Sequence, residues 1–212
     1  MMGDNLPTLL AAWSAFAAAA ISPGPNMVAV ASRALGSGRT SALATTAGIA
    51  AGAFGWALLT ALGLGALFEA LPDLLSVLGL LGGVYLTWLG VKGWRAAATG
   101  KGGEIAPVEG RGRRADFIHG FVVTGTNPKV ALLWASLSTF VGGATTSVPL
   151  LLLFAGVSAL LAAAIYGTYA VAFASGPARQ VYARFSRVAE GVFGTVFGLL
   201  GVAMIARATR AA

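Results

Sequence analysis

Cysteine is absent from the 212-residue chain, and histidine occurs once, at His119. The lack of cysteine excludes disulfides, thiolate nucleophiles and cysteine-ligated metal sites. One histidine also cannot supply the pair of ligands that a haem held between transmembrane helices needs. The sequence therefore predicts a protein without a metal or a cofactor.

Charged residues are scarce as well, at 10% of the chain, whereas a soluble domain typically has about 25%. Hydrophobic residues make up 57% of the positions, and the mean hydropathy is +0.82. So little polar surface predicts an integral membrane protein without a soluble domain. Lysine and arginine outnumber acidic residues by 14 to 7. Because they gather in connections between apolar stretches, the excess indicates orientation in a membrane and not nucleic-acid binding.

Long uncharged stretches place six transmembrane helices on the chain, since about 20 residues cross the hydrocarbon core. The spans are expected at residues 5–32, 40–68, 74–91, 117–140, 148–174 and 188–206. The first lacks a basic n-region, so it is interpreted as a span and not as a cleaved signal peptide. A polar linker at 95–114 divides one transmembrane domain, 1–212, into halves of about 1–98 and 115–212. The predicted fold is thus all-α, with six transmembrane helices arranged as two inverted three-helix repeats.

Basic residues predict which side of the membrane each connection faces, because lysine and arginine concentrate in cytoplasmic loops. Eleven of the 14 fall in the first, third and fifth connections. The second and fourth connections have none, and the C-terminus has only Arg207 and Arg210. Both termini are therefore predicted outside, with the linker at 95–114 in the cytoplasm.

Glycine pairs at four-residue spacing begin at Gly48, Gly79 and Gly194. Such small-residue pairs let two helices approach closely in lipid. Packing within one chain is the favoured interpretation, and contact between two subunits of a homodimer stays open.

Two polar interruptions lie within otherwise apolar sequence. Residues 22–26 read Ser-Pro-Gly-Pro-Asn, and residues 124–129 read Thr-Gly-Thr-Asn-Pro-Lys. Each lies in the first helix of a three-helix half, and an odd number of helices makes the second half enter the membrane in the opposite direction. Interrupted helices at corresponding positions of inverted halves are the best sequence indication of a transporter's binding site.

The prolines of these interruptions determine what they offer a ligand. Proline has no N–H, so the carbonyls of Ala19, Ile21 and Thr124 lose the helical partners that lie four positions later. Such backbone groups must be buried in protein or line a wet cavity. Asn26 and Asn127 are expected to cap the half-helices that follow them. Freed N–H groups favour an anion and freed carbonyls a cation, which suits a zwitterionic amino acid. The alternative is a pair of proline kinks with an architectural role.

The candidate substrate-binding residues are those of the two interruptions: Ser22, Pro23, Gly24, Pro25, Asn26, Thr124, Thr126, Asn127, Pro128 and Lys129. Lys129 lies well inside a span, where a charge is costly and by default indicates function. It is also a candidate for proton coupling, although a lysine that reaches the interface or pairs with freed carbonyls is the alternative. Asp116 and His119, three positions apart, are further candidates at the cytoplasmic mouth. Two interfacial polar residues need no function, however.

Three stretches together resemble the LysE/RhtB family of bacterial amino-acid exporters: residues 22–32 (SPGPNMVAVAS), 80–93 (LLGGVYLTWLGVKG) and 120–133 (GFVVTGTNPKVALL). The resemblance covers essentially the whole chain, and its specificity comes from the PGPN and NPK elements jointly. It implies a transporter of the bacterial inner membrane that exports amino acids or similar small metabolites, driven by the proton gradient. The expected partners are an amino-acid substrate and the lipid bilayer, with no nucleic acid.

Two other classes of membrane protein were weighed against this interpretation. An embedded enzyme would need paired aspartates, a Ser/His pair or metal ligands within the spans, and the sequence has none, so an enzyme is not expected. A polytopic membrane protein with a structural or partner-binding role stays open as the alternative.

Overall fold

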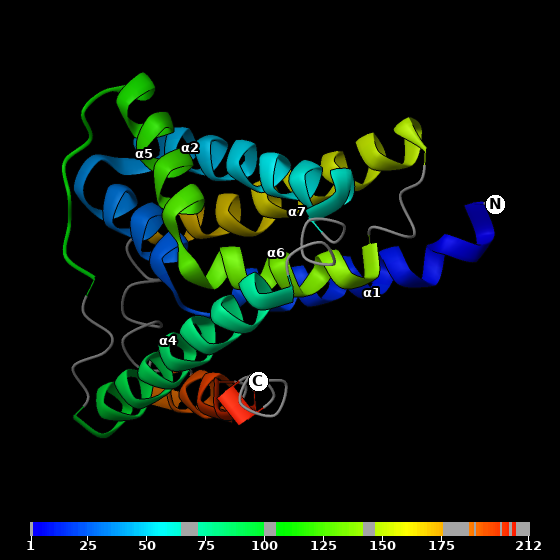
Figure 1. Cartoon of the computed structure of the whole chain (residues 1–212). Helices are drawn as coiled ribbons and strands as arrows, with labels where there is room; N and C mark the ends of the chain where they lie inside the picture. The colour runs from blue at the N-terminus through cyan, green and yellow to red at the C-terminus, as the bar shows by residue number, and fades with distance from the viewer. Residues whose placement is uncertain are drawn as a thin grey trace. The chain divides into compact units, whose positions relative to one another are not determined.

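The computed structural model describes residues 2–64, 72–99, 105–141, 147–175 and 187–206, except 189, 200 and 204. Its helices are α1 (Met2–Ile21), α2 (Pro25–Leu59), the π-helical turn η1 (Thr60–Leu64), α4 (Pro72–Thr99), α5 (Arg113–Thr126), α6 (Pro128–Val141) and α7 (Val148–Ala174) (Figure 1). The described part of 187–206 is also helical, and no strand occurs among the described residues. The all-α prediction is confirmed, and the arrangement as six spans in two inverted repeats stays a prediction.

Two helices of the described chain are long and apolar enough to cross a membrane, Pro25–Leu62 and Val148–Ala174. Two shorter apolar helices cover Asn5–Ile21 and Glu190–Ala203. The bounds of α7 coincide with the span predicted at 148–174. The helix begins there because Pro149 fits a first helical turn, where a missing N–H leaves no carbonyl unpaired.

The connection predicted between the first two spans, at 33–39, is a turn at Gly38, and the residues on either side of it are helical in α2. The chain changes direction at a single residue, Gly38, which has φ 75° and ψ −172° (Figure 1). Glycine tolerates this left-handed conformation because it has no Cβ. Arg33, expected in an exposed loop, is buried within the helix, since Asp116 neutralises its charge.

The chain forms two compact units. Unit 1 comprises Met1–Ala66 and Ile105–Ala178, and unit 2 comprises Leu67–Glu104 and Arg179–Ala212. In unit 1, α2 packs most extensively against α7 and α5, and α1 packs against α7 and α6. An aromatic cluster lies in the core, where the Trp134 ring is 5.2 Å from Phe16 and 5.9 Å from Phe154.

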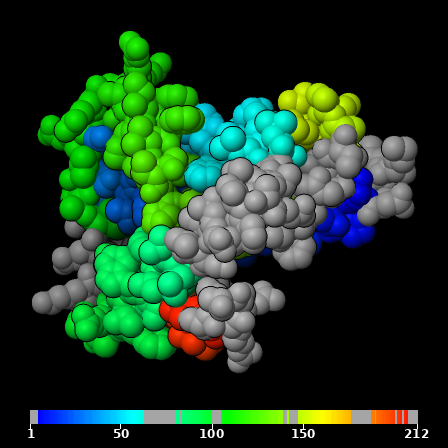
Figure 2. Space-filling model, viewed as in Figure 1, coloured from blue at the N-terminus to red at the C-terminus, as the bar shows by residue number. Residues whose placement is uncertain are grey.

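Glycines bring α2 and α5 together in unit 1. A methyl group at Gly48 would overlap the Phe117 carbonyl, and one at Gly120 would overlap the carbonyl of Thr45. At Gly52 it would come within 2.9 Å of the Thr124 side chain. Figure 2 shows α2 atoms in blue partly covered by the green atoms of residues 105–126. The glycine pair at Gly48 therefore packs within the chain, as the favoured interpretation had it.

Close contacts at glycines also hold the helices of unit 2 together. A methyl group at Gly90 of α4 would come within 2.7 Å of the Gly198 backbone, and one at Gly194 within 3.0 Å of the Gly90 carbonyl. Gly83 lies similarly close to the Gly201 carbonyl. Glycines of α4 thus meet glycines of residues 187–206 backbone to backbone. The side-chain surroundings of Gly79 lie outside the described residues.

Candidate functional site

The first interruption separates α1 from α2 in unit 1. Residues 22–24 are not helical, and α2 restarts at Pro25 in its first turn. The two carbonyls predicted to lose helical partners find others: Ala19 O accepts from Ser22 Oγ at 2.8 Å, and Ile21 O accepts from the Tyr169 hydroxyl at 2.7 Å. The break is therefore satisfied by side chains, as buried backbone in lipid must be.

The second interruption is a single residue, Asn127, which is extended (φ −76°, ψ 109°) between α5 and α6. Its Oδ1 accepts from the backbone N–H of Lys129 at 3.1 Å, so Asn127 caps α6 as predicted. The carbonyl of Thr124, predicted to lose its partner to a proline, accepts from Trp56 Nε1 at 3.3 Å. Both ends of this break are thus held by side chains.

The prediction that Asn26 also caps a helix is wrong. The residue before α2 is Gly24, which makes no side-chain capping bond, and Asn26 lies inside the first turn. A proline at the helix start already fits the place where an N–H would have no partner. The Asn26 side chain is consequently available for a contact elsewhere.

That contact joins the two interruptions. Asn127 Nδ2 donates to Asn26 Oδ1 at 3.1 Å, and both side chains are 4% exposed. Lys129 also reaches across: its Nζ donates to Ser22 O at 3.2 Å, to Pro23 O at 3.5 Å and to Ser22 Oγ. Residues that are about a hundred positions apart in the sequence therefore form one polar cluster.

A cavity of about 20 Å³ lies beside this cluster, within unit 1. Apolar side chains of α1, α2 and α6 form part of its lining. The polar residues that line it come from both breaks: Ser22, Asn26, Thr124, Asn127 and Lys129. The Thr124 hydroxyl is buried without a hydrogen-bond partner. This volume holds about one water molecule. A ligand larger than a water molecule therefore requires the site to open.

The predicted site residues divide into two groups. Ser22, Gly24, Asn26, Thr124, Asn127 and Lys129 line the cavity. Pro23, Pro25 and Pro128 do not line it but shape the breaks, and the exposed Thr126 donates to Val122 O of its own helix at 2.8 Å. The structure thus gathers six of the ten candidates around one space.

Two tyrosines of α7 are site residues that the sequence did not reveal. Tyr166 lines the cavity, and Tyr169 holds the end of α1. They lie within a uniformly apolar helix, which shows no periodicity to mark one face. A tyrosine in such a span was the only available signal, because its hydroxyl needs a partner when buried.

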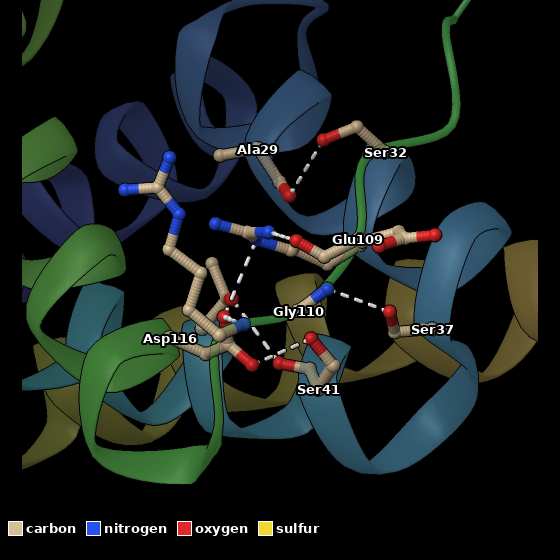
Figure 3. Close-up of polar contacts among 10 residues, drawn as sticks. Ala29, Ser32, Ser37, Ser41, Glu109, Gly110 and Asp116 are labelled. Carbon is tan, nitrogen blue, oxygen red and sulfur yellow. Dashed lines mark hydrogen bonds and ion pairs between the residues drawn. The ribbon is translucent and has the colours of Figure 1, made fainter.

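Asp116, a candidate for proton coupling, is part of a second polar cluster at the start of α5 (Figure 3). Its carboxylate lies 3.4 Å from Arg33 Nε and accepts from Ser41 Oγ at 2.7 Å and from the Arg111 N–H at 3.2 Å. The segment 105–112 lies across α2 here, since Arg33 Nη1 donates to the Glu109 carbonyl. Asp116 is therefore held in a buried ion pair with Arg33.

The chain is similar to known bacterial proteins over most of its length. The family described as LysE type translocator matches residues 17–207. A threonine efflux protein of Salmonella typhimurium is 30% identical over 195 residues, which cover 88% of this chain and 92% of the relative. A homoserine/homoserine lactone efflux protein of the same organism is 32% identical over 117 residues, 55% of this chain and 56% of the relative. An uncharacterized membrane protein of Haemophilus influenzae is 26% identical over 188 residues, 87% of this chain and 90% of the relative. No solved structure matches the chain significantly.

Proposed function

Because the chain belongs to the LysE type translocator family, we propose that it exports amino acids or related small metabolites from the cytoplasm by proton antiport. The observation that carries this proposal is the hydrogen bond from Asn127 to Asn26, which joins two helix breaks at a polar cavity. Relatives named for threonine efflux and for homoserine and homoserine lactone efflux support an amino-acid substrate. The protein acts as a transporter of the bacterial inner membrane and not as an enzyme.

The substrate-binding residues are those of the two breaks that surround the cavity. The end of α1 presents carbonyl oxygens at Ser22 and Pro23, and a helix C-terminus carries partial negative charge. The start of α6 carries partial positive charge and the Lys129 side chain, which favour an anion. A zwitterionic amino acid has both charges a few ångströms apart, so its two ends match the two breaks.

Proton coupling uses a titratable group on the transport path. The sequence offers Asp116, His119 and Lys129, of which Lys129 lines the cavity. Asp116 is engaged by Arg33, so its role there is to hold α2 and α5 together. Lys129 is accordingly the first residue to test for coupling.

The proposed orientation has both termini outside and the linker at 95–114 in the cytoplasm. The absence of native cysteine makes this directly testable, because a cysteine introduced at Lys101 is the only thiol in the protein. A membrane-impermeant maleimide should label it in inverted vesicles and leave it unlabelled in intact cells. Labelling in intact cells would reverse the topology.

Transport itself is tested in proteoliposomes loaded with a panel of amino acids that includes threonine and homoserine. An acidic exterior should accelerate efflux of at least one of them, and a protonophore should abolish the acceleration. Liposomes without protein and liposomes with the Asn127→Ala variant are the controls. Flux without any pH dependence would leave an exporter but remove antiport. The absence of flux for the whole panel would favour a structural or partner-binding role.

A further inference from the structure

Three oxygen atoms at the end of α1 surround the ammonium group of Lys129. Ser22 O and Pro23 O accept from Nζ at 3.2 and 3.5 Å, and Ser22 Oγ accepts a third bond. An ammonium group has three N–H donors and no acceptor, so a set of oxygen acceptors such as this one is complementary to it. The end of α1 is therefore already built as a binding site for a primary ammonium.

This ammonium site opens onto the cavity proposed to hold the substrate. Ser22 is 3% exposed, and both Ser22 and Lys129 line the cavity. No acidic residue is among the described residues of the lining. The carbonyl and hydroxyl dipoles at the end of α1 stabilise the Lys129 charge, and they serve any other ammonium equally well.

The Lys129 backbone is held in place, whereas its side chain is a long stem that can take other conformations. The Lys129 N–H is held by Asn127 Oδ1 at 3.1 Å. A methyl group placed on Gly24 would lie 3.4 Å from Nζ and 3.6 Å from Cδ, so the lysine stem lies directly over a residue without a side chain. The stem itself is a flexible four-carbon chain.

Building on the proposed function, we infer that Ser22 O, Pro23 O and Ser22 Oγ form the subsite for the α-ammonium group of the substrate, and that Lys129 occupies it as a tethered competitor when no substrate is bound. An arriving amino acid displaces Nζ from the three oxygens, and the released Lys129 pairs with the substrate carboxylate. No charge is left without a partner in either state. The displaced stem also vacates space beside a cavity that now holds about one water molecule.

This exchange defines the substrate class as neutral, zwitterionic α-amino acids. An amine without a carboxylate can displace Lys129 but brings no anion to pair with the released ammonium group, whose desolvation is costly. A cationic amino acid introduces a second ammonium that meets no acidic residue in the described lining. Both should bind much more weakly than a neutral amino acid of similar size.

The deciding experiment compares threonine with threoninol, which keeps the side chain and the ammonium but lacks the carboxylate. Binding to the purified protein is measured by thermal shift or calorimetry for the wild type, Lys129→Ala and Lys129→Gln. The wild type should prefer threonine by about tenfold or more, the value of one charge-assisted hydrogen bond. In both variants the preference should vanish or invert, because threoninol no longer has a lysine to displace. A lysine with a purely structural role would weaken both ligands alike, and an unchanged preference would overturn the inference.

A second experiment replaces the removed part of the lysine side chain with a small amine added in solution. It keeps the test decisive if the variants are unstable. Propylammonium supplies the three carbons and the ammonium group that Lys129→Ala lacks. It should raise the melting temperature of that variant by about 2–4 °C. If the variant is too unstable for a melting curve, propylammonium should instead increase its yield of folded protein. The wild type and Lys92→Ala, a lysine variant in α4, should not respond, and neither should Lys129→Ala with propionate. The same response in all proteins, or none in Lys129→Ala, would refute the ammonium subsite.

The two proposals fail in different ways. Amino-acid flux in the wild type without any propylammonium effect in Lys129→Ala would leave the exporter and remove the subsite. A propylammonium response without flux for any amino acid would leave the ammonium site and remove the proposed function.

Discussion

Asn127 donates a hydrogen bond to Asn26 over 3.1 Å, although 101 positions separate them in the sequence. Each residue belongs to a helix interrupted near a proline, and each is almost completely buried. The bond therefore fixes the two interruptions against each other and makes one site from two halves of the chain.

Replacing Asn127 with alanine should weaken both folding and transport. The variant loses the cap on α6 and the bond to Asn26, and a lost asparagine cap alone costs about 0.5–2 kcal/mol. Asn26→Ala loses the cross-break bond but keeps the cap, so its melting temperature should fall less. Amino-acid efflux should drop in both variants by about tenfold or more. Full transport by Asn127→Ala would count against the site.

Gly120→Ala should strongly destabilise the protein, because the added methyl group overlaps the Thr45 carbonyl. Overpacking of this kind typically costs about 1–3 kcal/mol. The matched control is Gly125→Ala in the same helix, where a methyl group meets no atom within 4 Å. Alanine there should be neutral or slightly stabilising, by up to about 1 kcal/mol. Equal melting temperatures for the two variants would contradict the close approach of α2 and α5.

Asp116→Asn should be among the most destabilising single changes at the start of α5. Arg33 and Asp116 are 5% and 1% exposed, so the variant leaves a buried guanidinium without its anion. Breaking a buried pair in this way costs about 3–5 kcal/mol. Glu109→Gln is the control, because Arg33 binds the Glu109 backbone carbonyl and the Glu109 side chain is exposed. Thermal unfolding in detergent distinguishes them, and comparable losses in both variants would place the stabilising interaction elsewhere.

Tyr169→Phe removes the hydroxyl that holds the Ile21 carbonyl at the end of α1. The expected loss of stability is about 0.5–1.5 kcal/mol, typical of one hydrogen bond. Tyr85→Phe in α4 removes the same atom from another helix and serves as the comparison. Efflux should decrease in Tyr169→Phe even though the variant stays folded, since the end of α1 forms part of the proposed site. A variant that transports and unfolds like the wild type would show that Ile21 O finds another donor.

The sequence predicted the breaks well because proline acts locally. The three carbonyls expected to lose helical partners are those of Ala19, Ile21 and Thr124, and all three accept side-chain hydrogen bonds. The bounds of α7 followed from its uniform hydropathy and its proline. These features depend on one residue and its neighbours along the chain.

Features that depend on residues distant in sequence were not predicted. Arg33 was assigned to a loop, since its partner Asp116 lies 83 positions away and only the fold brings them together. Tyr166 and Tyr169 are hidden by the even hydropathy of α7, which gives no amphipathic pattern. A connection was predicted at 33–39, but the sequence did not indicate that Gly38 alone turns the chain while the residues on either side stay helical.

The glycine contacts between α2 and α5 also limit which parts of unit 1 can move when the cavity opens. Backbone meets backbone at Gly48 and Gly120 without an intervening side chain, so the two helices cannot slide past each other without a clash. The parts of α2 and α5 around these glycines are therefore expected to move together. Rotation is left to residues 22–24 and Asn127, where the chain is not helical. The residues proposed to bind the substrate are therefore also the places where the chain can turn, so in this proposal a bound amino acid acts directly on the joints whose rotation releases it.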